Sequence, residues 1–168
     1  NTGWEQILFE AARRPLGPVE NPRTLHVFSA ISKDITIARE LQGLLVIRGL
    51  QLQAQGQPEQ FLPRLDAALT LSRNQRRQQS SYSCVEAVLA ERISLQALNR
   101  WLEKLPASET ALPRAALAIV QKHEATCPRD PSEPFLTDRM ILRNTLNSPS
   151  LWAPQQLQGM MELTTRSG

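Results

Sequence analysis

A chain of 168 residues is long enough to bury one substantial core, and 41% of its residues are apolar. Leu, Ala, Gln, Arg and Glu dominate and glycine is scarce, so the composition predicts an all-α fold. The net charge of +3, from 19 basic and 16 acidic residues, indicates a solvated surface, and we expect no nucleic-acid partner. No run of about 18 apolar residues is present, so the sequence predicts no membrane-spanning segment.

The first predicted helix covers residues 4–11, where apolar residues recur at helical spacing, and it ends at Arg13 and Arg14. Residues 15–22 hold three prolines and a glycine and predict an irregular link. Helical spacing returns over residues 24–55. This stretch is either one long helix or two helices with a break near Ser32, and the sequence leaves both open.

The rest of the chain is organised around residues 41–73, two apolar helical runs that meet at Gly56-Gln57-Pro58. Gly56 suits the left-handed conformation that closes a helix, and Pro58 suits the first turn of the next one. Because this corner is short, the two helices must run antiparallel and pack on each other. The apolar positions expected to line this hairpin are Leu41, Leu44, Leu45, Ile47, Leu50, Leu52, Phe61, Leu62, Leu65, Ala68, Leu69 and Leu71.

Further helices are predicted after the hairpin. A long one starts at Ser81 and ends before Pro106, and the next lies between Glu109 and Pro128. Residues 128–134 hold three prolines and predict a loop, after which residues 135–146 predict another helix. The segment 151–168 has enough apolar residues for a last amphipathic helix, with a frayed end. The core positions expected on the long helix are Val85, Val88, Leu89, Ile93, Leu98, Trp101, Leu102 and Leu105.

The expected architecture is one helical domain over residues 1–168, with six or seven helices in an antiparallel bundle or a short helical stack. Within it, residues 1–22 are the first helix and its proline-rich link. Residues 24–127 are the hairpin core, and residues 128–168 are a C-terminal extension.

The hairpin carries a set of small and apolar residues that is found in one repeat family. Gly49 and Ala68 are small enough for two helix axes to approach closely, and Gly56 marks the corner. The other matching positions are Leu45, Leu52, Phe61, Leu65 and Leu69. On these residues the hairpin resembles a tetratricopeptide repeat unit. The resemblance covers about a fifth of the chain and implies a helical stack with a groove for a peptide or protein.

A second resemblance extends over nearly the whole chain. It is carried by Asn1-Thr2-Gly3-Trp4, Leu71-Ser72-Arg73, Trp101-Leu102, Ala115-Ala116-Leu117, His123-Glu124 and Pro128. In this order of features the chain is similar to a set of uncharacterised helical proteins of planctomycete-type bacteria. The resemblance implies an exported or membrane-tethered protein of the bacterial periplasm or cell envelope. Since the sequence starts at Asn1 without methionine, we expect a mature segment, with a leader or anchor upstream left open.

His123 and Cys127 are the best pair of metal ligands that the sequence offers. They lie four residues apart, so on one helix they share a face, and Cys84 is a further candidate ligand. Glu124 beside His123 matches part of the zinc-protease helix motif, but the second histidine of that motif is absent. A histidine near a helix end also interacts favourably with the helix dipole without any metal. We therefore predict no metal and no cofactor.

The two cysteines have a second possible role. Cys84 and Cys127 would pair in an exported protein and remain two buried thiols in a reducing compartment, and the sequence leaves both open. Arg73, Arg76 and Arg77 cluster at a predicted helix end, where they are candidates for contact with phosphate or with a partner's acidic patch. Basic residues at a helix C-terminus are equally explained by the helix dipole.

No Gly-x-Ser-x-Gly turn and no glycine-rich phosphate loop is present, so we assign no catalytic or cofactor-binding residue. The function that the sequence favours is a non-catalytic module that binds a protein or peptide between its helices. The alternative is a small metal-dependent or hydrolytic enzyme centred on the helix of His123 and Cys127. The alternative predicts that Cys84, His123, Glu124 and Cys127 converge in one pocket.

Overall fold

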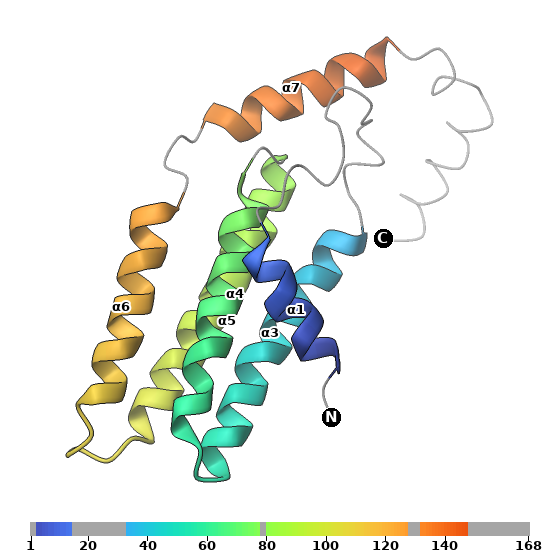
Figure 1. Cartoon of the computed structure of the whole chain (residues 1–168). Helices are drawn as coiled ribbons and strands as arrows, with labels where there is room; N and C mark the ends of the chain where they lie inside the picture. Colours follow the sequence, from blue (N-terminus) through green and yellow to red (C-terminus); the bar gives the residue numbers. More distant parts are fainter. Residues whose placement is uncertain (1–2, 15–32, 78–79, 128–131, 148–168) are drawn as a thin grey trace, which may run out of the picture.

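The computed structural model of the chain describes residues 3–14, 33–77, 80–127 and 132–147 (Figure 1). These residues form α1 (Gly3–Arg13), α3 (Lys33–Ala54), the short 3-10 turn η1 (Pro58–Gln60), α4 (Phe61–Gln75), α5 (Ser81–Glu103), α6 (Ala111–Thr126) and α7 (Ser132–Leu146). Six α-helices of the described residues pack against one another and no strand occurs among them, so the predicted all-α bundle is confirmed. The predicted link at 15–22 and the predicted helix within 151–168 lie outside the described residues.

The predicted hairpin is confirmed: α3 and α4 run antiparallel on either side of the corner (Figure 1). Gly56 has φ of 83°, the left-handed conformation that glycine adopts without steric cost. Its amide donates to the carbonyl of Gln53 at 2.9 Å, which closes the end of α3. The described part of α3 begins at Lys33, and residues 24–32 lie outside the described residues, so the choice between one long helix and two stays open.

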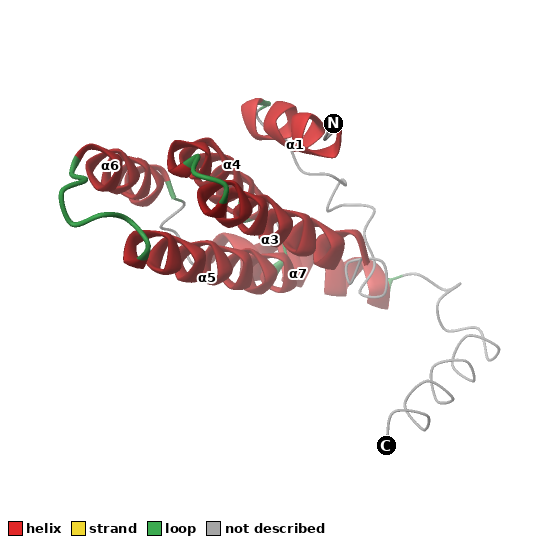
Figure 2. Ribbon diagram, turned by 90° about the horizontal axis from the view of Figure 1, so that it is seen from below, coloured by secondary structure: helices red, strands yellow, loops and turns green. Residues whose placement is uncertain are grey.

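Helices α3, α4 and α5 pack side by side in a triangle, and α4 is the most deeply buried of the three (Figure 2). Trp101 of α5 ties the hairpin corner to this core. Its ring stacks on Phe61 with centroids 5.1 Å apart, and its Nε1 donates to the carbonyl of Pro58 at 3.0 Å. Both rings are fully buried. The main core cluster comprises Val46, Phe61, Leu65, Ala68, Leu69, Ala97, Leu98, Trp101 and Ala116.

The face that α5 buries differs from the predicted one. Ile93 is partly buried and Leu98 and Trp101 are buried as expected, but Val85, Val88, Leu89 and Leu102 are exposed. The buried face is made of small residues, which let α5 lie close to α3 and α4. The large apolar residues next to that face are therefore turned outward. The small buried residues, spaced three or four apart, are Ser83, Ala87, Ala90, Ser94 and Ala97.

A similar rotation applies to α3. Leu45 and Leu52 are buried as predicted, whereas Leu44 and Ile47 are exposed. The polar residue Gln42 is buried instead, where its Nε2 donates to Gln75 Oε1 at 3.1 Å. The apolar residues of α3 thus serve two faces, one directed at the core and one at the surface.

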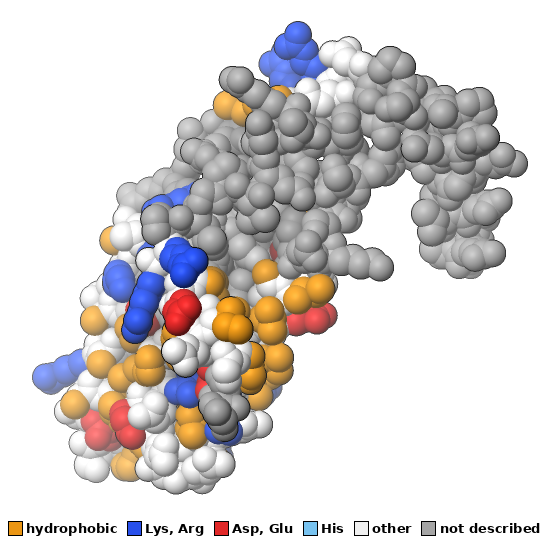
Figure 3. Space-filling view, turned by 45° about the vertical axis from the view of Figure 1, so that its right-hand side comes forward, with side chains coloured by type: hydrophobic (Ala, Val, Ile, Leu, Met, Phe, Trp, Pro, Cys, Tyr) orange, Lys and Arg blue, Asp and Glu red, His pale blue; other side chains and the backbone are white. Residues whose placement is uncertain are grey.

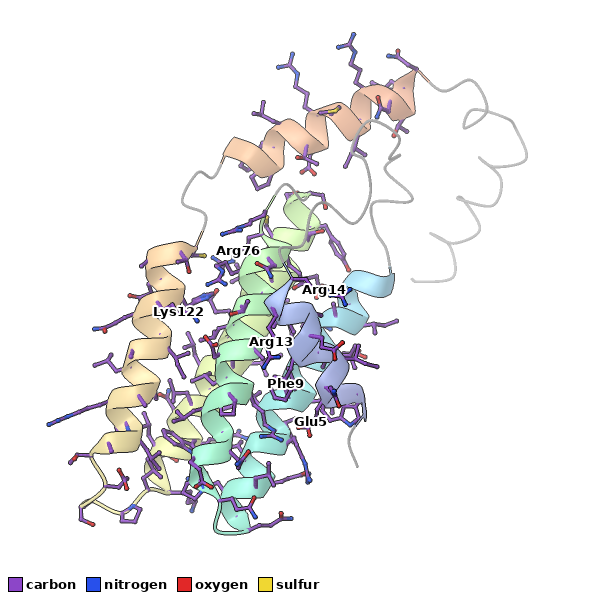
Figure 4. The ribbon with its side chains drawn as sticks, viewed as in Figure 1. Glu5, Phe9, Arg13, Arg14, Arg76 and Lys122 are labelled. Carbon is purple, nitrogen blue, oxygen red and sulfur yellow. The ribbon has the colours of Figure 1, made fainter. Side chains whose placement is uncertain are left out.

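Two helices cover two sides of the triangle. Helix α1 packs through Leu8 and Phe9 over Leu45 of α3 and Leu71 of α4. It is fixed there by Glu5, whose Oε1 accepts from Arg64 Nε at 2.8 Å, with both side chains buried (Figure 4). Helix α6 packs mainly on α4, and its Ala116 belongs to the main core cluster, which also includes Ala97, Leu98 and Trp101 of α5.

Helix α7 crosses the top of α5 (Figure 1). Asp138 Oδ1 accepts from the backbone amide of Ser81 at 3.1 Å, which satisfies a free N–H at the start of α5. The helix begins at Ser132, three residues earlier than predicted, and takes in the end of the expected loop. Pro134 is its third residue, a position where the amide N–H of any residue would lack a partner within the helix.

Candidate functional site

The first candidate site lies where the C-terminal ends of α4 and α6 meet α5. Arg76, which caps the C-terminal end of α4, is its centre, and its guanidinium reaches both other helices (Figure 4). Nη2 forms an ion pair with Glu91 of α5, and Nη1 donates to Sγ of Cys127 at 3.2 Å. On the other side of Glu91, His123 Nε2 lies 3.4 Å from Oε1. Four side chains from three helices therefore form one chain of polar contacts.

His123 is buried, with only 4% of its surface exposed. It therefore packs inside the molecule, and its role is not limited to an exposed interaction with the helix dipole. The contact with His123 lowers the pKa of Glu91 most, partial burial raises it, and the charge of Arg76 lowers it again. The pKa of Glu91 therefore lies below its ordinary value, and the carboxylate is ionised at neutral pH.

The alternative function, a small metal-dependent or hydrolytic enzyme, predicts four side chains in one pocket, and the structure brings them together only in part. Cys84 lies close to the same cluster, since its Sγ donates to the backbone carbonyl of Arg76 at 3.8 Å, and no disulfide joins Cys84 to Cys127. Glu124 is exposed, and Glu91 takes the place beside His123. In the described part of the chain, no group of three or more His, Cys, Asp or Glu side chains is arranged to hold a metal ion. The cation between these residues is the guanidinium of Arg76.

The three arginines predicted to face a partner have different surroundings. Arg73 Nη1 donates to Thr126 Oγ1 at 2.6 Å, and Arg76 is held by Glu91 and Cys127. Both arginines therefore connect α4 to its neighbouring helices. Arg77 is exposed at the end of α4. Partner contact by this cluster remains a prediction, and Arg77 is its accessible member.

The second candidate site is a groove of about 680 Å³ between α3 and α5. Sequence reasoning missed it. We call it the α3–α5 groove; its walls include Glu40, Leu44 and Ile47 of α3 and Leu89, Arg92 and Ile93 of α5. Gly43 forms part of the lining, and a Cβ added there would lie 3.8 Å from Ile93 Cγ2.

The groove combines exposed apolar side chains with a charged rim. Leu44 and Ile47 are each 48% exposed and Leu89 is 36% exposed, although residues of this type are normally buried. Figure 3, a view from the side of the bundle that carries α1 and α3, shows that apolar side chains also reach the surface between charged ones on that neighbouring face. Glu40 and Arg92 are exposed on opposite walls. An apolar floor with a charged rim is the usual composition of a protein-binding surface.

One sequence signal for this groove was present. Small residues recur on α5 at positions 87, 90, 94 and 97, and such a stripe is typical of a close helix contact. Had this stripe been assigned to the core, Val88 and Leu89 would have been predicted at the surface. The helical spacing of the larger apolar residues instead predicted Val88 and Leu89 in the core.

Known proteins add nothing to the description of either candidate site. No protein-family model, no curated protein and no solved structure matches the chain. Among the described residues, no helix is long and apolar enough to cross a membrane.

Proposed function

We propose that this chain is a non-catalytic helical module that binds a protein or peptide partner in the α3–α5 groove. The observation that carries the proposal is the exposure of Leu44, Ile47 and Leu89 along a groove of about 680 Å³. Apolar side chains that line a concave surface lose contact with water when a partner covers them, which favours binding by about 25 cal/mol per Å² of apolar area.

The character of the two candidate sites supports this choice. In the cluster around Arg76, the guanidinium already contacts Glu91 and Cys127 of the same chain. In the groove, the apolar walls have no covering helix among the described residues. The α3–α4 hairpin, which resembles a tetratricopeptide repeat unit, is also of a kind that holds peptides between helices.

The proposal is tested by comparing two matched surface variants as bait in a cell extract. Ile47→Glu places a charge in the groove, and Leu117→Glu places the same charge on α6, where Leu117 is 56% exposed. Since both side chains are at the surface, both variants are expected to keep the helical circular dichroism of the wild type. A partner of the groove is recovered with wild type and Leu117→Glu, and its recovery falls roughly tenfold or more with Ile47→Glu. Equal recovery of all bound proteins with both variants would contradict the proposal.

A further inference from the structure

The triangle of α3, α4 and α5 has three outer sides, each lying between two neighbouring helices. Helix α1 covers the side between α3 and α4, and α6 covers the side between α4 and α5 (Figure 2). No described helix covers the third side, which is the α3–α5 groove. The two covered sides therefore show what kind of element this triangle accepts on a third.

Both covered sides are held in the same way. Each covering element is an amphipathic helix, of 11 residues in α1 and 16 in α6. Each packs an apolar stripe into its side of the triangle and adds one ion pair to α4. In α1 the pair is Glu5 with Arg64 at 2.8 Å, and in α6 it is Lys122 with Asp66 at 3.1 Å (Figure 4).

The α3–α5 groove offers the same two components without a partner from the described residues. Its apolar stripe is Leu44, Ile47 and Leu89. Its charges are Glu40 on the α3 wall and Arg92 on the α5 wall, both exposed and neither in an ion pair with another described residue. Arg39 of α3 differs in this respect, because its Nη1 forms an ion pair with the buried Glu86 at 2.8 Å.

We infer that the partner of the α3–α5 groove is an amphipathic α-helix of another protein, with an acidic residue on the flank that meets Arg92 and a basic residue on the flank that meets Glu40. The groove extends over residues 39–47 of α3, about 12 Å at 1.5 Å per residue, so a helix of about eight or nine residues spans it. Its apolar residues recur at i, i+3 or i+4, and i+7, as in other helices that bind in grooves. This inference rests on the proposed function, and it names the partner of the same groove.

The test uses three synthetic peptides of 14 residues and the full chain. The charged peptide has a leucine stripe with glutamate on one flank and lysine on the other. The neutral peptide has the same stripe and glutamine on both flanks, and the scrambled peptide has the composition of the charged one without a stripe. Binding is measured by fluorescence anisotropy. The charged peptide is expected to bind about tenfold or more tightly than the scrambled one.

The charge assignment is tested by Arg92→Glu. This reversal replaces an attraction by a repulsion at an exposed site, and it is expected to weaken binding of the charged peptide about threefold to tenfold. It leaves the affinity of the neutral peptide unchanged. Arg100→Glu is the matched control, because Arg100 is exposed on α5 outside the groove, and it changes neither affinity.

Several results would overturn the inference. Equal affinity for the charged and scrambled peptides would refute the helical partner, and insensitivity to Arg92→Glu would refute the charge assignment. A photo-reactive p-benzoylphenylalanine in place of Ile47 forms a cross-link to whichever segment or molecule occupies the groove, and the cross-linked product identifies that occupant. Cross-links confined to residues 148–168 of the same chain, or to a second copy, would identify an occupant other than a partner protein. If no peptide binds but Ile47→Glu still abolishes partner capture, the helical partner is wrong and the proposed function stands.

Discussion

Two glycines of α3 give a matched test of the packing described above. A Cβ added at Gly49 would lie 2.7 Å from Cδ2 and 3.2 Å from Cα of Phe61. Ordinary carbon contacts are about 3.5–4.0 Å, so this methyl group overlaps its neighbour. Phe61 is fully buried and stacks on Trp101, and one of the two overlapping atoms belongs to the backbone. Neither helix can move aside without disturbing the core.

At Gly43 the same methyl group has room. The nearest atom, Ile93 Cγ2, would be 3.8 Å away, which is an ordinary contact. Alanine stabilises a helix interior by about 0.5–1 kcal/mol relative to glycine, and Gly43→Ala is expected to show this gain in full. At Gly49 the same gain is opposed by an overpacking cost of about 1–3 kcal/mol. Because one of the overlapped atoms is the backbone Cα of Phe61, the cost lies in the upper part of this range, and Gly49→Ala is expected to lower the free energy of unfolding by about 1–2.5 kcal/mol.

The assay is urea unfolding of wild type and the two variants, followed by circular dichroism and tryptophan fluorescence. In thermal unfolding, each kcal/mol corresponds to roughly 2–4 °C in a chain of this size. The two variants should fall on opposite sides of wild type although the chemical change is identical. If Gly49→Ala is as stable as wild type or more so, the close approach of α3 to Phe61 is wrong.

Three further predictions concern the core, α1 and the Glu91 cluster. Leu65→Ala is expected to cost about 2–5 kcal/mol in urea unfolding, because Leu65 is fully buried in the main core; a cost near zero would mean that this face of α4 is not core. Glu5→Gln leaves the charge of Arg64 buried without its carboxylate, so hydrogen exchange should show faster exchange in α1 while α4 and α5 stay protected. Unchanged protection of α1 would refute the role of this ion pair. The lowered pKa of Glu91 adds stability that is complete above about pH 4.5 and is lost as the pH falls through the folded-state value. The difference in stability between wild type and Glu91→Gln should therefore shrink below pH 4.5, and a constant difference would contradict the assigned cause.

The helical architecture was predictable because it depends on local signals. Gly56 at the corner, Pro58 after it and the apolar spacing of residues 41–73 act within a few residues of one another, and the hairpin they predicted is present. The starts of α5 and α6 were placed correctly for the same reason. A cap or a turn is decided by its immediate neighbours.

The faces of the helices were less predictable, because they depend on distances between helices. The small stripe of α5 is buried since it allows close packing, and Leu89 is consequently displaced to the surface. Hydrophobicity alone ranks Leu89 above Ala90 and cannot reveal this choice. The partners of His123 were missed for a related reason. Glu91 and Arg76 come from two other helices, and nothing in the spacing around His123 indicates them.

The most direct test of the groove is a residue-resolved titration by nuclear magnetic resonance. Amide signals of the full chain are recorded while the charged peptide is added. We expect shifts concentrated in residues 39–47 of α3 and 89–96 of α5, with α6 unaffected. Shifts centred on α6, or no shifts at peptide concentrations that saturate the anisotropy signal, would contradict the claim that this chain binds its partner in the α3–α5 groove.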